Sequence, residues 1–81
     1  MTLLELKKGH IARISGVHGS AEERNRFTSM GLIPGKQVML RNQAPFGDPR
    51  IYVIMGYELS LRNKDAEKIK VEPLELTPPN P

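Results

Sequence analysis

Residues 26–35 read Arg-Phe-Thr-Ser-Met-Gly-Leu-Ile-Pro-Gly, and they mark the place where a helix must give way to a loop. Phe27 and Met30 are three residues apart, so they share one helix face and are expected to pack inward. Gly31 stands where helices commonly end in the left-handed conformation, which glycine adopts without a steric penalty. The apolar residues that follow close on a Pro-Gly corner. The stretch therefore predicts the last turns of a helix, its stop and a short loop.

The start of this helix is predicted from a capping box. Ser20 and Glu23 are spaced so that each side chain can accept a backbone N–H of the other residue. The helix is therefore expected over residues 21–30. Alternating apolar residues predict one strand over residues 10–17 before the helix and a second over residues 37–41 after it.

A hairpin is predicted further along the chain. Residues 51–55 are apolar at every position, so periodicity alone cannot assign their two faces. The pair Gly56-Tyr57 predicts a type II′ turn, which prefers glycine first. Such a turn places Val53 opposite Ser60, and paired residues share a face of the sheet. The core face then holds Tyr52, Ile54, Leu59 and Leu61.

The outer face of the same hairpin carries an apolar ridge, formed by Ile51, Val53 and Met55, among polar neighbours. Three apolar residues on one strand face form a contiguous patch. Two explanations remain open for this patch. Either residues 3–6 or the proline-rich end of the chain fold across it, or it is a docking face for a partner or for a second copy of this chain.

The loop over residues 44–49 reads Ala-Pro-Phe-Gly-Asp-Pro. Two prolines fix the backbone, and Asp48 can accept hydrogen bonds from backbone amides in a turn. We expect a stiff, exposed loop with Phe46 near its tip. Phe46 is then either a lid on one end of the fold or a partner contact.

The length of 81 residues allows one small domain. A short helical turn over residues 63–66 and a final strand over residues 69–71 complete five short strands and one helix. This pattern predicts an all-β fold with one helix, a small, partly open barrel over residues 1–73. Residues 74–81 form a proline-rich tail that is expected to be flexible, because three prolines among the last four residues cannot join a sheet.

Composition excludes several classes of function. The chain has no cysteine, which excludes disulfides and thiolate chemistry. The apolar runs are too short to span a membrane, and the first residues lack a signal-peptide pattern, so a cytoplasmic location is expected. His10 and His18 are eight residues apart, and an extended strand of that length spans roughly 26 Å. We therefore expect no metal site, no cofactor and no enzymatic activity.

Several short motifs, taken together and in order, resemble the ferrous iron transport protein A (FeoA) family. The family pattern Arg-Leu-x-x-Met/Leu-Gly-Leu/Met-x-Pro-Gly is matched by residues 26–35, with Phe27 in place of leucine. Residues 44–49 match its Ala-Pro-x-Gly-Asp-Pro loop, and residues 56–62 match its Gly-Tyr-x-Leu-x-Leu-Arg strand. Ser29 departs from the family, which usually has an acidic residue there. The resemblance covers residues 3–72, and it implies that the small barrel is SH3-like.

The resemblance implies a small cytosolic accessory protein of bacterial ferrous iron uptake. Such a protein docks on the membrane GTPase-permease FeoB, modulates it, and reaches the inner membrane only through that partner. The residues expected to contact a partner are Phe46 and the apolar ridge of Ile51, Val53 and Met55; a homodimer is a further candidate assembly.

Two alternatives remain, a nucleic-acid-binding small barrel and a free-standing regulatory module that senses metal or a peptide. The net charge is only +3, and the basic residues are spread along the chain. Single-strand binders present exposed aromatics on a basic groove. Two of the four aromatic residues, Phe27 and Tyr52, are assigned to the core. No nucleic-acid partner is therefore expected.

Overall fold

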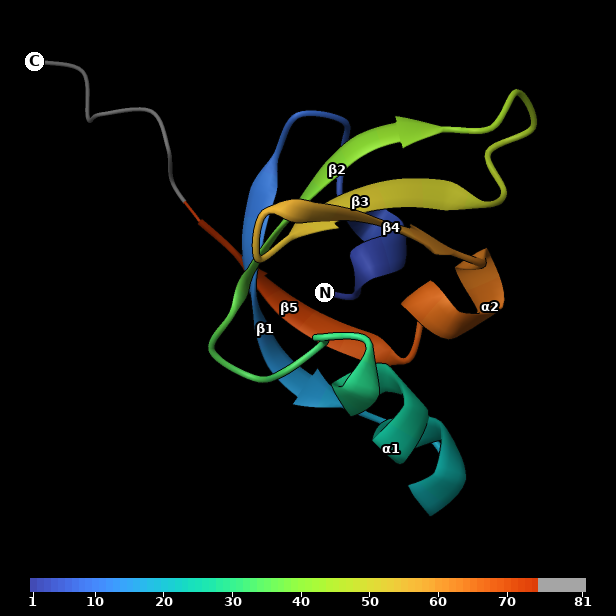
Figure 1. Ribbon diagram of the computed structural model, residues 1–81. Helices are drawn as coiled ribbons and strands as arrows, with labels where there is room; N and C mark the ends of the chain where they lie inside the picture. The colour runs from blue at the N-terminus through green and yellow to red at the C-terminus, as the bar shows by residue number, and fades with distance from the viewer. Residues whose placement is uncertain (75–81) are drawn as a thin grey trace, which may run out of the picture.

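A computed structural model describes residues 1–74 as a curled, five-stranded antiparallel sheet with the order β4-β3-β2-β1-β5 (Figure 1). The elements, in chain order, are η1 (Leu3–Glu5), β1 (Ile11–Val17), α1 (Ala21–Ser29), β2 (Gln37–Gln43), β3 (Arg50–Ile54), β4 (Tyr57–Leu61), α2 (Asn63–Ala66) and β5 (Ile69–Pro73). Strands β4 and β5 form the two edges of the sheet and do not pair with each other. The barrel is therefore partly open, as predicted.

One core fills the inside of the curled sheet. Its members are buried apolar residues of the strands, of α1 and the loop after it, of α2 and of the N-terminal segment: Leu3, Leu6, Ala12, Ile14, Phe27, Leu32, Val38, Leu40, Tyr52, Ile54, Leu61, Ala66, Ile69 and Val71. Phe27 is fully buried, and Met30 is half-buried against the same core. The inward packing predicted for this helix face is confirmed.

The N-terminal turn η1 closes the inside of the barrel. Leu3 is fully buried, and its carbonyl accepts a hydrogen bond of 3.2 Å from the Tyr52 hydroxyl. The Arg50 guanidinium donates to the carbonyls of Leu4 at 2.7 Å and of Leu6 at 3.2 Å. The alternative in which residues 3–6 cover the apolar ridge is therefore wrong. The proline-rich tail was the other candidate cover, and its residues 75–81 lie outside the described part of the chain.

The hairpin between β3 and β4 turns one position earlier than predicted. The turn residues are Met55 and Gly56, with φ of 50° and 83°, and Ile54 pairs with Tyr57. Positive φ at both central residues is the signature of a type I′ turn, which prefers glycine second. The prediction of a type II′ turn at Gly56-Tyr57 is therefore wrong.

The faces of the hairpin are nevertheless as predicted. Val53 pairs with Glu58 instead of Ser60, a shift of two residues along β4. Side chains alternate with a period of two, so an even shift leaves every residue on its face. Tyr52 is buried, and Val53 stays on the outer side.

The capping box that begins α1 is confirmed and extends to a third residue. The Ser20 hydroxyl accepts from the Glu23 amide at 3.1 Å, and the Glu23 carboxylate accepts from the Ser20 amide at 2.9 Å. The same carboxylate pairs with the Lys68 ammonium, just before β5. The Lys68 hydrogen bond, followed by that from the Ser20 backbone, lowers the pKa of Glu23 from 4.5 to about 2. One carboxylate thus ties the start of α1 to the start of the last strand.

The lowered pKa of Glu23 predicts a pH-dependent contribution to stability. A carboxylate whose pKa is lowered by folding stabilises the native state above its unfolded pKa, and this contribution is lost as the pH falls through the folded pKa. We expect Glu23→Gln to lower the melting temperature at neutral pH. The difference from the parent chain should shrink as the pH falls from 4.5 to about 2.

The measurement is thermal melting by circular dichroism across this pH range. Glu22→Gln is the matched control, because it removes the same charge from an exposed neighbouring position in the first turn of α1. A difference between Glu23→Gln and the parent chain that stays constant with pH would contradict the assignment.

Candidate functional site on the outer face of the sheet

An apolar row crosses the outer face of the sheet over three strands. Ile11 of β1 pairs with Met39 of β2, and Met39 pairs with Val53 of β3. All three side chains are half-buried, and Met55 beyond the end of β3 is 52% exposed. These residues belong to an apolar hollow of about 260 Å³, lined by Ile11, Gln37, Val38, Met39, Val53 and Met55.

The predicted ridge and the observed hollow overlap only in part. Val53 and Met55 line the hollow, whereas Ile51 does not. A bulge in β2 between Leu40 and Asn42 shifts the register, so Ile51 pairs with Asn42 on one side and Ser60 on the other. Ile51 is therefore half-buried among polar neighbours. The hollow extends instead toward β1.

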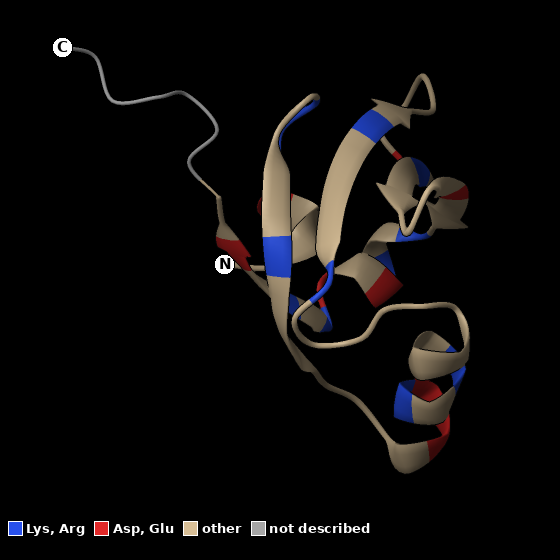
Figure 2. Ribbon diagram, turned by 60° about the vertical axis from the view of Figure 1, so that its left-hand side comes forward, with Lys and Arg blue, Asp and Glu red and all other residues tan. Residues whose placement is uncertain are grey.

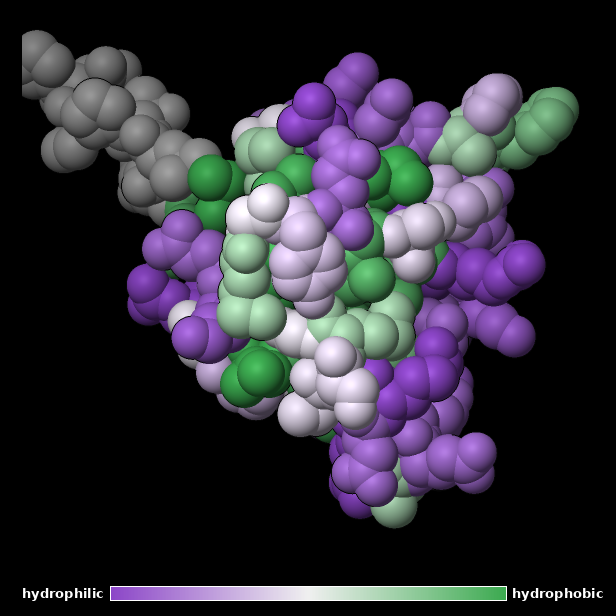
Figure 3. All heavy atoms as spheres, in the orientation of Figure 1, coloured by the Kyte–Doolittle hydropathy of each residue, from purple (hydrophilic) through white to green (hydrophobic). Residues whose placement is uncertain are grey.

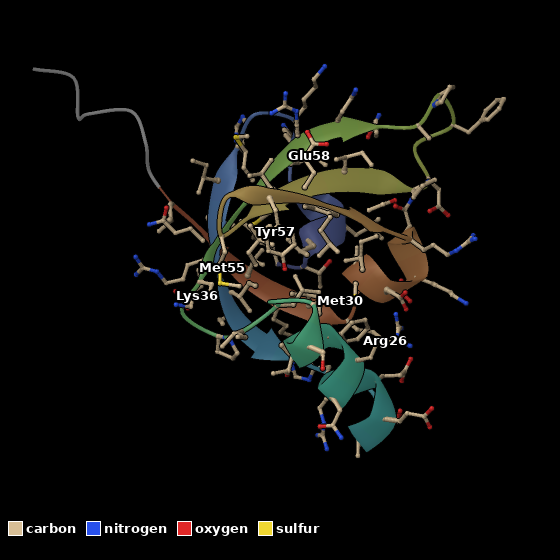
Figure 4. The ribbon with its side chains drawn as sticks, viewed as in Figure 1. Arg26, Met30, Lys36, Met55, Tyr57 and Glu58 are labelled. Atoms are coloured by element: carbon tan, nitrogen blue, oxygen red, sulfur yellow. The ribbon has the colours of Figure 1, made fainter. Side chains whose placement is uncertain are left out.

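The end of α1 is packed against the β3–β4 turn beside this hollow. The Tyr57 hydroxyl donates a hydrogen bond to the carbonyl of Met30, the residue that ends the helix. A Cβ atom added at Gly31 would lie 2.6 Å from the Tyr57 hydroxyl and 2.7 Å from the Met55 terminal methyl. Figure 4 shows Met55 and Tyr57 descending from the hairpin toward Met30. Met55, one wall of the hollow, is thus held by the helix end.

Polar groups surround the apolar residues of this face. The guanidinium of Arg41 on β2 pairs with the carboxylate of Glu58 on β4 at 2.8 Å, so this ion pair reaches across β3. Both side chains are more than half exposed, and such surface pairs contribute at most about 1 kcal/mol to stability. In the view of Figure 3, apolar surface gathers over the strands, and the region of α1 is hydrophilic.

The loop between β2 and β3 presents Phe46 to solvent. The Phe46 side chain is 99% exposed, and the loop stands away from the body of the fold in Figures 1 and 3. The alternative of a lid on the barrel end is therefore wrong. Asp48 accepts a hydrogen bond of 3.0 Å from the Asn63 amide, which belongs to α2 and not to the loop itself. The Asn63 side chain in turn donates to the Gly47 carbonyl at 2.9 Å. The base of the loop is thus bound to α2.

The remaining candidate residues are dispersed. His10 and His18 are both exposed, and within residues 1–74 no three His, Asp or Glu side chains gather at a position that could hold a metal ion. The exposed aromatics Phe46 and Tyr57 lie at opposite ends of β3, and Figure 2 shows basic and acidic residues interspersed over the ribbon. This placement does not favour a nucleic-acid interface. No helix in the described residues is long and apolar enough to cross a membrane.

Sequence reasoning missed Ile11 and Met39, although both line the hollow. Each is a single apolar residue on the outer face of its own strand, and scattered exposed apolar residues are common. Their significance depends on the pairing of β1, β2 and β3, which brings them beside Val53. Only the alternation of apolar residues in β1 and β2 could have indicated which face they occupy.

Comparisons with known proteins indicate the family of this chain. A family model described as the FeoA domain matches residues 1–73. The chain is 44% identical over 72 residues to an Fe(2+) transport protein A/Fe(2+) transporter FeoB fusion protein of Porphyromonas gingivalis, a match that covers 89% of this chain and 8% of the fusion protein.

Solved structures show the same fold. Iron(II) transport protein A from Clostridium thermocellum matches with a TM-score of 0.87 and 34% identity, over 91% of this chain and 46% of that one. FeoA from Stenotrophomonas maltophilia, complexed with zinc and described as an SH3 domain protein, matches with a TM-score of 0.77 and 25% identity over 89% of each chain. The SH3-like fold class is therefore confirmed. The chain spans less than half the length of the Porphyromonas and Clostridium relatives.

The close approach at Gly31 predicts a specific sensitivity to substitution. Gly31 and Gly35 both have φ of 94°, but a Cβ atom at Gly35 would meet nothing within 4 Å. Gly35→Ala therefore measures the cost of the left-handed backbone alone, roughly 1–2 kcal/mol. Gly31→Ala adds the collision with Tyr57 and Met55, and such overpacking typically costs about 1–3 kcal/mol more.

The measurement is the free energy of unfolding in urea for both variants. Equal losses in the two variants would show that the hairpin turn is not packed against the helix end as described.

Proposed function

The chain belongs to the FeoA family, and on that premise we propose that it is a small, non-enzymatic accessory protein of bacterial ferrous iron uptake that docks on the permease FeoB and modulates it. The observation that carries this proposal is the fusion protein of Porphyromonas gingivalis, in which a relative of this chain and FeoB form one polypeptide. Covalent linkage keeps two domains at high effective concentration. Joined or not, the two proteins need complementary surfaces to make contact.

The apolar hollow and Phe46 are the features that suit such docking. Val53 and Met55 are accessible from outside the sheet, and Phe46 is almost fully exposed. Each apolar side chain contributes roughly 1.5–3 kcal/mol when a partner buries it completely. Ile51, half-buried beside Ser60, lies on the same face and would join the periphery of the contact.

The Arg41–Glu58 ion pair places charged groups beside this apolar surface, the arrangement of an apolar centre and a polar rim that protein interfaces commonly show. Residues 1–73 are the docking domain in this proposal. We place the protein at the cytoplasmic face of the inner membrane, held there by the permease and not by its own insertion.

The proposal predicts that a charge in the hollow weakens permease binding. Val53→Glu introduces a carboxylate among Ile11, Met39 and Met55, where burial by a partner would leave it unpaired. We expect at least a tenfold weaker affinity for purified FeoB in detergent, measured by isothermal titration calorimetry. Thr28→Glu, which adds the same charge at an exposed helix position, should bind as the parent chain does.

Circular dichroism must first show that Val53→Glu is folded. A folded variant with unchanged affinity would exclude the hollow as the docking face. Failure of the parent chain to bind FeoB, with or without guanine nucleotide and ferrous iron, would refute the docking function itself.

A further inference from the structure

We propose that copies of this chain associate head to tail, with Phe46 of one copy seated in the apolar hollow of the next copy. Within residues 1–74, an exposed aromatic side chain stands on a projecting loop and an apolar hollow lies on the sheet. Both features are apolar, so burying the ring in the hollow would remove apolar surface from water. The inference does not depend on the permease.

The Phe46 loop is suited to act as the inserting element. The Gly47 amide donates to the Ala44 carbonyl at 2.7 Å, and the Ala44 amide donates to the Pro49 carbonyl at 3.0 Å. The two hydrogen bonds to Asn63 attach the loop to α2. A loop that is already ordered loses little conformational entropy on binding. A phenylalanine side chain with 99% exposure also leaves nearly all of its apolar area available for burial.

The hollow is suited to receive a phenyl ring. The hollow is an open depression of about 260 Å³ on the sheet surface, whereas a fully enclosed benzene occupies a cavity of about 150 Å³. Met39 and Met55 form two of its walls. Methionine side chains are flexible enough to adapt to a ring, and their sulfur atoms make favourable contacts with aromatic edges.

Phe46 cannot reach the hollow of its own molecule. Met39 and Gln43 are four residues apart along β2, which is roughly 13 Å of extended strand. The loop begins beyond Gln43 and projects further from the sheet, as Figure 1 shows, and its base is bound to α2. A Phe46 ring seated in the hollow must therefore belong to a second copy.

Charge favours this contact as well. The carboxylate of Asp48 is exposed two residues beyond Phe46. At the hollow, Arg13 lies between Gln37, a lining residue, on β2 and Glu72 on β5, and its side chain is exposed on the same outer face as Ile11. Figure 4 shows Lys36 beside Met55. Seating Phe46 would bring the Asp48 carboxylate toward a rim with two basic residues and one acidic residue, where a net positive charge attracts it.

The contact is heterologous, because two different surfaces meet, and it can therefore extend from copy to copy. One ring in one hollow buries far less than the roughly 1,000 Å² of a stable interface. We expect a dissociation constant of about 0.1–1 mM. If the permease uses the same hollow, as proposed above, self-association and permease binding exclude each other; this consequence alone rests on the proposed function.

Sedimentation equilibrium from about 20 µM to 2 mM, which brackets this dissociation constant, tests the inference without any permease. The weight-average mass of the parent chain should rise with concentration. Phe46→Ala, which lacks the ring, and Val53→Glu, which blocks the hollow, should each remain monomeric. Thr28→Glu should associate as the parent chain does. If Val53→Glu does not fold, Met55→Glu takes its place, because Met55 is half exposed.

The decisive sample is an equimolar mixture of the two monomeric variants. Phe46→Ala still offers a hollow and Val53→Glu still offers a ring, so the mixture should form 1:1 dimers and nothing larger. A parent chain that stays monomeric at 2 mM, association that survives Phe46→Ala, or a mixture that remains monomeric would each overturn the head-to-tail contact.

Discussion

The missing side chain at Gly31 is the constraint on which the arrangement of this fold depends. It lets the β3–β4 turn approach the end of α1 so closely that a single added carbon would collide with Tyr57 and Met55. That approach allows the Tyr57 hydroxyl to bond the last helical carbonyl at Met30. This contact joins the end of α1 to the β3–β4 hairpin, which follows it in the sequence. The position of Met55, and with it one wall of the apolar hollow, follows from this contact.

Local features of this structure were predictable from the sequence because their causes are local. The capping box needs only Ser20 and Glu23 at the right spacing, and the glycine stop needs only Gly31 after the last turn. The faces of the hairpin were predictable even though its turn was not. Both possible turns place inward and outward residues in the same alternation, and only the pairing partners differ.

Non-local features could not be predicted in the same way. The hollow exists because three strands place Ile11, Met39 and Val53 side by side, and nothing near Ile11 in the sequence specifies that alignment. The bulge in β2 that separates Ile51 from the hollow is likewise visible only in the register. The direction of Phe46 is set by Asn63, which lies 16 residues from Gly47. The family resemblance predicted the fold class correctly because whole-chain motif order carries information that single motifs lack.

The exposed Phe46 ring and the apolar hollow limit how strongly a partner can bind at this surface. A fully exposed ring and a shallow hollow support weak binding, because the area they bury is small. In a fusion protein such as that of Porphyromonas gingivalis, a tether raises the effective concentration to the millimolar range, where a weak contact is largely occupied. Without such a tether, the same contact would need additional contacts from the permease. The polar rim around Val53 and the half-buried Ile51 are where such contacts would form, and they would not be needed for one ring to enter one hollow. If the permease docks on the hollow as proposed, permease docking and self-association would differ in affinity, and the permease would displace the second copy.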